Sequence, residues 1–250
     1  MTFVHVDDVT IGDGRNIEDL YTLVSITGWR DGVDYRRDRT PRPARHGEFS
    51  TRGYKSGRLV RVEVEVSTPS SHAVRHVEAL DRLIGILDDG GEGQLTIDDD
   101  DRKLWAMASR YGAPEVTPIQ ENVLSAVALR FLTPDPRRYS IDETKFGPAA
   151  TLTLFHEGNS AALPTLSVQG PSAGYTLTFS TGDVVTVPGG LAAGQSDVLS
   201  GATQWVKRAG STLPLLGTTG HVPEIPKGRD VTVTVAGAAS ISGTVAHTYS

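Results

Sequence analysis

The second half of the chain, from Gly147 to Ser250, is built of short apolar stretches separated by turn-forming residues. The separators include Gly-Asn, Gly-Pro and Gly-Asp pairs, and no stretch with helical periodicity interrupts the series. Evenly spaced short strands of this kind predict an antiparallel β-sandwich of roughly 100 residues. The expected strands are Thr151–Phe155, Thr165–Val168, Tyr175–Phe179, Val184–Val187, Asp197–Leu199, Trp205–Arg208, Asp230–Val235 and Ser240–His247.

The distribution of charge divides the chain at the same place. Residues 1–146 hold 20 of the 24 Lys and Arg residues and 25 of the 30 Asp and Glu residues, whereas residues 147–250 hold the other 4 and 5. Such a break in surface chemistry indicates two domains with different neighbours, 1–146 and 147–250. The Gly-Pro segment Thr144–Ala150 is the expected linker.

The first domain combines two periodicities. In Arg58–Ser67 four valines alternate with charged residues, which predicts a strand with one buried face. In Ser70–Asp89 apolar residues recur at intervals of three and four, which predicts one helix with a stripe of Ala73, Val77, Leu80, Ile84 and Leu87. Further strands are expected at Tyr21–Thr27, Gln94–Ile97, Lys103–Tyr111 and Asn122–Leu132. The fold class is therefore mainly β, with an α+β N-terminal domain.

The sequence contains no pattern that favours a cofactor, a metal or an enzyme. It has no cysteine, so thiolate ligands and thiol nucleophiles are excluded. His72 and His76 have the i, i+4 spacing of metal ligands, but without a third ligand a solvent-facing pair is expected. The acids Asp98–Asp101 are consecutive, unlike those of a calcium loop, and predict a hairpin turn. Gly12-Asp13-Gly14 lacks the third glycine of a dinucleotide motif.

Charge and hydropathy limit the environment of the chain. The net charge of −6 argues against a global attraction to nucleic acid or to an anionic membrane. No basic segment with an apolar stretch marks a secretion signal, and no stretch approaches the roughly 18 apolar residues of a membrane helix. We expect a protein that is made and assembled in a cytoplasm without contact with membranes.

The stretch from Trp29 to Arg61 is basic and lacks a sustained hydrophobic period. It holds ten Lys or Arg residues against four acids, with aromatic residues and prolines among them. Its composition favours a long arm that becomes ordered on a neighbouring subunit or partner. A solvated loop and a single-stranded nucleic-acid site are the alternatives. The arginines of the expected inter-subunit arm are Arg36, Arg37, Arg39, Arg42 and Arg45.

The second domain offers two weaker functional candidates. Trp205 could stack against a sugar ring, which would make the sandwich a carbohydrate-binding module, although a Trp in a strand is more often part of the core. A wall hydrolase would need a pair of carboxylates in a cleft. The acids available for that role in this half are Glu157, Asp183, Asp197, Glu224 and Asp230.

Two motifs resemble those of the distal tail protein family of siphophages. Leu129–Tyr139, LRFLTPDPRRY, is similar to the strand and DPRxY segment that close the N-terminal domain of that family. His156–Gly170, HEGNSAALPTLSVQG, is similar to the opening of the C-terminal domain, with His156 at a position where the family often has Asn. The order of elements, including a strand at Arg58–Ser67 followed by a helix, extends the resemblance over nearly the whole chain.

The resemblance implies a structural role in the virion. A split-barrel-like N-terminal domain with one helix would close into a hexameric ring at the tail tip, with DNA passing through its lumen without specific binding. A galectin-like β-sandwich would follow, without the sugar-binding residues of true galectins. The implied partners are the tail tube protein, the tape measure protein and the tail-associated tip protein, and no cofactor or metal is implied.

Overall fold

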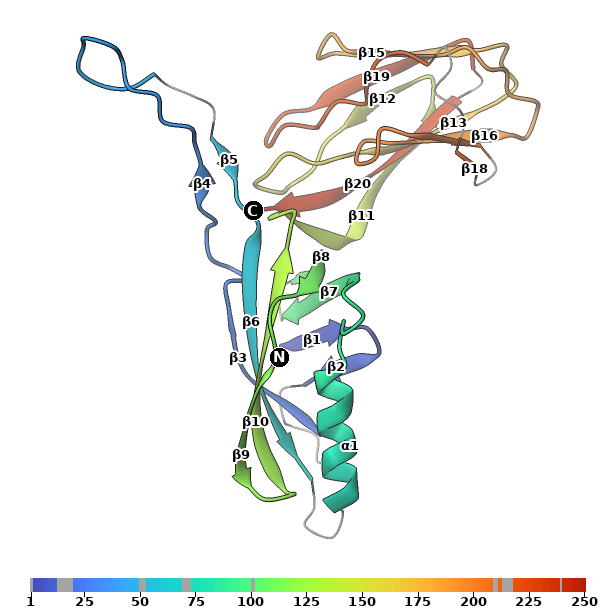
Figure 1. Cartoon of the computed structure of the whole chain (residues 1–250). Coiled ribbons are helices and arrows are strands. Elements are labelled where there is room, and N and C mark those ends of the chain that lie inside the picture. The colour runs from blue at the N-terminus through green and yellow to red at the C-terminus, as the bar shows by residue number, and fades with distance from the viewer. Residues whose placement is uncertain are drawn as a thin grey trace. The chain divides into compact units, whose positions relative to one another are not determined.

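The computed structural model describes residues 2–12, 20–49, 53–68, 73–99, 102–208, 211–212, 218–238 and 240–250. The chain forms two compact units, Met1–Arg138 with Ser250, and Tyr139–Tyr249 (Figure 1). In the described part of the chain, strands dominate both units and the single α-helix lies in the first. The predicted mainly β class is confirmed. No helix among the described residues has the length and apolar character needed to cross a membrane.

The first unit contains a four-stranded antiparallel sheet in the order β9, β10, β6, β3. Its strands are β9 (Glu115–Gln120), β10 (Leu124–Thr133), β6 (Arg58–Ser67) and β3 (Tyr21–Thr27). Strand β6 has the bounds that the valine alternation predicts. Val62 and Val64 of β6 lie opposite Leu129 and Val127 of β10, and all four side chains are buried. This row of paired aliphatic side chains is the core face of the sheet.

A second group of strands completes this unit, together with the helix. Strands β2 (Val9–Ile11), β1 (Phe3–Val6), β7 (Glu92–Asp99) and β8 (Arg102–Arg110) pair in that order, all antiparallel. Strand β8 also pairs with one end of β10 through two residues. Strands β7 and β8 form a hairpin with Asp99 opposite Arg102, so Asp98 and Asp99 of the predicted turn belong to β7, whereas Asp100 and Asp101 lie outside the described residues.

Helix α1 (Ala73–Ile84) is shorter than the periodicity predicts and buries a different face. Its buried residues include His76, Ala79 and Leu83, whereas Val77 of the predicted stripe is exposed. Tyr21 donates a hydrogen bond of 2.9 Å to the Ala79 carbonyl, which holds this face against β3. The helix ends before Gly85 because the chain then turns, with Leu87 at φ 49°.

His76 accounts for the rotation of the helix. Its side chain is 2% exposed, and its Nδ1 and Nε2 lie 3.1 Å from Thr68 Oγ1 and 3.0 Å from Ser125 Oγ. Because both ring nitrogens have hydroxyl partners, the imidazole can be buried at little cost. The expectation of a solvent-facing His76 is therefore wrong, and His72 lies outside the described residues.

The second unit is a sandwich of two antiparallel sheets. One sheet has the order β12 (Thr151–Leu154), β19 (Val231–Ala236), β14 (Tyr175–Phe179), β15 (Val184–Val187). The inward side chains of the two sheets form one hydrophobic core, with Leu154, Leu166, Leu177 and Ile241 fully buried. The strands of the second sheet, in order, are β11 (Arg138–Ala149), β20 (Ser240–Tyr249), β13 (Thr165–Gln169), β16 (Ser196–Ser200), β17 (Val206–Arg208) and β18 (Ser211–Thr212).

The segment expected to be a linker belongs to the sandwich instead. Thr144–Ala149 continues strand β11, with a cis peptide bond between Gly147 and Pro148, and Phe146 packs against the sandwich core. The two units divide after Arg138. Gly and Pro at this point shape a strand, as they do at bends and edges of sheets, and do not separate domains.

Candidate functional site

Between β3 and β6 the chain forms the long basic arm that the sequence predicts (Figure 1). Its two legs pair through β4 (Tyr35–Arg36) and β5 (Tyr54–Lys55). Nearer the tip, Phe49 donates a backbone hydrogen bond of 3.0 Å to Thr40. No side chain in the described parts of the arm, residues 33–49 and 53–57, is buried, so these parts contribute no hydrophobic core.

The five arginines predicted for the arm are all exposed on it: Arg36, Arg37, Arg39, Arg42 and Arg45. Two of them lie over aromatic rings, Arg37 at 5.8 Å from the centroid of Tyr35 and Arg42 at 5.6 Å from that of Phe49. Both rings are themselves exposed. Aromatic and Arg side chains are enriched at protein interfaces, so the arm carries the chemistry of a contact surface.

The root of the arm is held by a buried arginine. Arg58, the first residue of β6, is 1% exposed. Its Nη1 donates to the carbonyls of Gly28, Trp29 and Asp31 at 2.7, 3.0 and 2.6 Å. One guanidinium thus binds three carbonyls of the single turn by which the arm leaves the sheet, and burial lowers the pKa of Arg58.

A second arginine supports the same turn. Arg138 donates from Nη1 to the Trp29 carbonyl at 2.7 Å, and its guanidinium lies 5.7 Å from the centroid of the Trp29 ring. Burial, and then the charge of Arg58, lower the pKa of Arg138 to about 10. Its Nε has no hydrogen-bond partner. Two buried guanidinium groups thus bind this one turn. Burial of a cation costs free energy, so their presence indicates that the conformation of the turn is important for the protein.

Gly28 lets the chain leave β3 at this turn. Its φ is +82°, and a Cβ there would lie 1.9 Å from the Leu59 carbonyl oxygen of the neighbouring strand. Any side chain would force β3 and β6 apart. The arm is thus fixed at its root by one glycine and two arginines.

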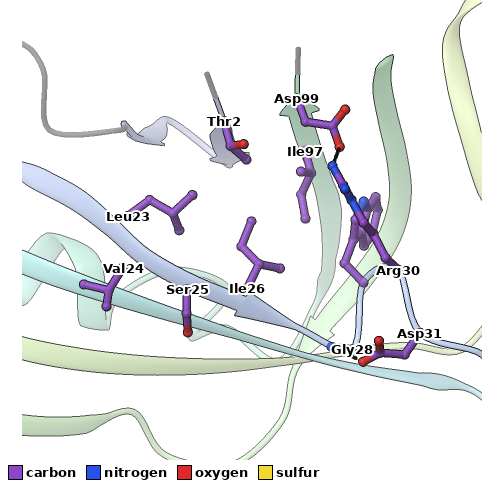
Figure 2. Close-up of a pocket in the computed structure, with 11 residues that line it drawn as sticks. Thr2, Leu23, Val24, Ser25, Ile26, Gly28, Arg30, Asp31, Ile97 and Asp99 are labelled. Atoms are coloured by element: carbon purple, nitrogen blue, oxygen red, sulfur yellow. Dashed lines mark hydrogen bonds and ion pairs between the residues drawn. The ribbon is translucent and has the colours of Figure 1, made fainter. Parts of the chain in front are cut away.

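A groove of about 660 Å³ runs beside strand β3 (Figure 2). Its apolar wall includes Leu23, Ile26 and Ile97. At one end Arg30 Nη2 and Asp99 Oδ2 form an ion pair of 2.5 Å. The groove has the size of a small-molecule pocket, but its wall includes a strand edge, which is also a surface for pairing with another strand.

In the sandwich, the buried carboxylate of Asp197 forms an ion pair with Arg208. Asp197 is 0% exposed, and its Oδ1 and Oδ2 accept hydrogen bonds of 2.7 and 2.8 Å from Arg208. Oδ2 also accepts a hydrogen bond of 3.0 Å from the Tyr175 hydroxyl, and burial raises the pKa of Tyr175. Arg208 Nη1 donates in turn to the Gly190 carbonyl at 2.6 Å. Asp197 is thus a structural anchor and is not placed to act as a catalytic carboxylate.

Trp205 is not part of the sandwich core, contrary to the usual position of a Trp in a strand. It lies just before β17, is 49% exposed, and borders a cavity of about 40 Å³ with Gln204 and His221. A cavity of that size holds about one water molecule and no sugar ring. Among the described residues, no group of three or more His, Asp and Glu side chains is arranged to hold a metal ion.

The burial of His156 predicts that the stability of the sandwich depends on pH. His156 Nδ1 accepts a hydrogen bond of 3.0 Å from the Gly158 amide, and its Nε2 lies 3.2 Å from the Ile225 carbonyl. Burial lowers the pKa of His156 below its ordinary value of 6.5. The unfolded chain therefore takes up a proton at a higher pH than the folded chain does.

We expect the urea midpoint of the sandwich to be constant above pH 6.5 with respect to this group, and to fall as the pH drops from 6.5 toward the lowered pKa. Denaturation at several pH values in wild type and in His156→Gln measures the effect, because the variant lacks the titrating group. Parallel curves for the two proteins across this range would contradict the prediction.

Of the comparisons with known proteins, only the comparison with solved structures gives matches. No protein-family model matches the sequence, and no curated protein matches it. The structure is similar to that of the Dit protein of phage SPP1, described as a paradigm of the hub adsorption apparatus in phages that infect Gram-positive bacteria. The TM-score is 0.75 at 13% identity, over 100% of both chains.

It is also similar to a chain of the phage P2 baseplate in its activated conformation, solved with Ca and again with Sr. In each case the TM-score is 0.59 at 7% identity, over 98% of this chain and 97% of the other. The resemblance to siphophage distal tail proteins that the sequence motifs predict is thereby confirmed at the level of the fold.

Proposed function

We propose that this chain, which has the fold of the Dit protein of phage SPP1, is a structural hub protein of a phage tail tip. The observation that carries the proposal is the match of both β-built units, which covers 100% of this chain and 100% of the other. A match of both units and of their order is more specific than a match of one sandwich, because single sandwiches serve many functions.

In this role the first unit forms a hexameric ring that joins the tail tube to the tip and adsorption proteins. The partners are the tail tube protein, the tape measure protein and the tail-associated tip protein. DNA passes through the lumen of the ring without specific binding. The protein is assembled in the host cytoplasm, resides in the virion and catalyses no reaction.

The arm is the proposed contact between neighbouring subunits. Its exposed Arg and aromatic side chains supply interface chemistry, and the anchored turn at its root fixes the direction in which it leaves the sheet. Each subunit would extend its arm to the next in a head-to-tail arrangement, which closes into a ring when the rotation permits.

Removal of charge from the arm tests this role. We expect Arg37→Ser/Arg42→Ser/Arg45→Ser to weaken assembly at least about tenfold, because charged contacts set the association of such surfaces. Sedimentation at low salt measures assembly, and the unfolding transition of the monomer should be unchanged because the three side chains are exposed.

The matched control is Lys207→Ser/Lys227→Ser/Arg229→Ser, which removes the same charge from exposed positions of the sandwich. It should assemble as wild type does. Equal assembly by wild type and the arm variant would show that the arm is not part of the interface. A wild-type protein that stays monomeric at high concentration, with no annulus in micrographs, would contradict the hub role itself.

Carbohydrate attachment through Trp205 is less well supported than the hub role. The indole is accessible, but the hollow beside it is far smaller than a sugar ring. The carboxylate of Asp197, a candidate for hydrolysis, is bound in an ion pair within the core. The structural role therefore accounts for more of the observed features than either alternative.

A further inference from the structure

Arginine side chains gather around the turn by which the arm leaves the sheet. The guanidinium groups of Arg58 and Arg138 both donate to the Trp29 carbonyl oxygen, at 3.0 and 2.7 Å, so these two cations lie side by side. The residue after Trp29 is Arg30, whose Nη2 pairs with Asp99 at the end of the groove beside β3 (Figure 2). The turn thus brings three arginines together within a few residues of one another in space.

The positive charge at this turn is only partly balanced by carboxylates. Burial lowers the pKa of Arg138 first, and repulsion by Arg58, Arg102 and Arg30 lowers it further. Asp99 acts in the opposite direction but does not restore the ordinary value. Like charges held close together favour the binding of an anion, because the anion relieves their repulsion.

One edge of the Arg138 guanidinium has no acceptor among the described residues. The residue is 7% exposed, it donates through Nη1 to the Trp29 carbonyl, and its buried Nε has no partner. The Nε and Nη2 groups of an arginine can together bind two oxygens of one carboxylate or phosphate group. A buried donor without an acceptor is costly, so an oxyanion at this edge would satisfy a donor that the described residues leave unpaired.

We propose that the root of the arm is a binding site for an oxyanion, phosphate or carboxylate, held by the Nε–Nη2 edge of Arg138 and by Arg30. The Arg30 side chain is 73% exposed, so it can meet the anion from solvent. The groove of about 660 Å³ that ends at Arg30 has room for a molecule larger than the anion itself. The site belongs to a single chain, so it does not depend on the hub role.

Binding of an oxyanion would stabilise the turn that directs the arm. Arg30 lies within the turn, whereas Arg138 is the first residue of β11 and contacts the turn from outside. An anion that binds both side chains would link them across Trp29. Opening of the turn would then require loss of the anion as well as loss of the hydrogen bonds to the Trp29 carbonyl.

Hydrogen exchange of the full chain with inorganic phosphate tests the site. If phosphate binds only the closed turn, exchange at residues 28–31 should slow about tenfold at roughly ten times the dissociation constant. Sodium chloride at matched ionic strength should not slow this exchange, and phosphate should not slow exchange in β16 of the sandwich. Acetate is the second probe. Protection by acetate as well would show that a carboxylate is sufficient, and protection by phosphate alone would identify phosphate as the ligand class.

Four variants locate the anion. Arg138→Met should abolish the protection, and Arg30→Ser should weaken phosphate binding about threefold, because each removes a charged donor. Asp99→Asn should strengthen binding, because it removes a carboxylate that repels the anion. The matched control is Arg82→Ser, an exposed arginine paired with Asp8 elsewhere in the same unit, which should behave as wild type does.

The exposed position of Arg30 keeps the test valid if Arg138→Met does not fold. Equal protection in wild type, Arg30→Ser and Asp99→Asn would overturn the site, because the anion would then bind elsewhere. Equal protection by sodium chloride and phosphate, or no protection by either probe, would also overturn it. None of these results would bear on the hub role, since the measurement needs no assembly.

Discussion

Replacement of Asp197 by alanine is expected to destabilise the sandwich by about 2–4 kcal/mol, a large part of the stability of a small domain, because its hydrogen bonds from a cation and from a buried hydroxyl are lost. The carboxylate is fully buried and accepts hydrogen bonds from Arg208 and Tyr175. Its removal leaves a cation without a counterion and a buried hydroxyl without an acceptor. The Tyr175 hydroxyl lies in the core and loses its acceptor, whereas Arg208 is partly exposed, keeps its bond to the Gly190 carbonyl and loses its counterion.

Hydrogen exchange of the amides in β16 measures the effect within the sandwich, and urea denaturation gives its size. Asp230→Ala removes an exposed carboxylate from the same unit and should change stability by no more than about 0.5 kcal/mol. Tyr175→Phe removes one hydrogen bond and should cost about 1 kcal/mol. A similar small effect for all three variants would show that the ion pair is not an anchor.

The sequence predicts strands well where one face is apolar and the other is charged. Strand β6 has the predicted bounds because its valines alternate with charged residues and face a single core. The face of α1 is predicted less well, since a pattern of apolar residues counts Val77 as buried and His76 as exposed. The structure reverses both, because Thr68 and Ser125, distant in sequence, supply the hydroxyls that make a buried imidazole stable.

The anchor of the arm could have been inferred in part. Arg58 precedes Val60 by two positions, so the alternation already places it on the core face of β6. The sequence gives no indication of what satisfies a buried guanidinium there, because the acceptors are backbone carbonyls at Gly28, Trp29 and Asp31. Composition does predict the arm itself, because a basic segment without apolar periodicity cannot build a core.

Replacement of Arg58 by methionine should therefore loosen the root of the arm and destabilise the first unit by about 3 kcal/mol, roughly 1 kcal/mol for each of the Gly28, Asp31 and Pro136 carbonyls that loses its donor. Burial of the cation opposes this effect, as its lowered pKa indicates, and methionine removes that cost. The loss prevails because the carbonyls of Gly28, Asp31 and Pro136 lose their donor together, whereas the Trp29 carbonyl keeps its bond from Arg138.

Arg36→Met makes the same change at an exposed position of the arm and should leave stability within about 0.5 kcal/mol of wild type. Arg58→Lys keeps the charge but lacks the planar fork, so it should behave more like Arg58→Met than like wild type. Hydrogen exchange at residues 28–31 should accelerate in both Arg58 variants and not in Arg36→Met. Because the arm would then leave the sheet in no fixed direction, Arg58→Met should also assemble less well than its folded fraction predicts. Normal assembly of Arg58→Met would show that the anchor at the root of the arm does not affect the interface.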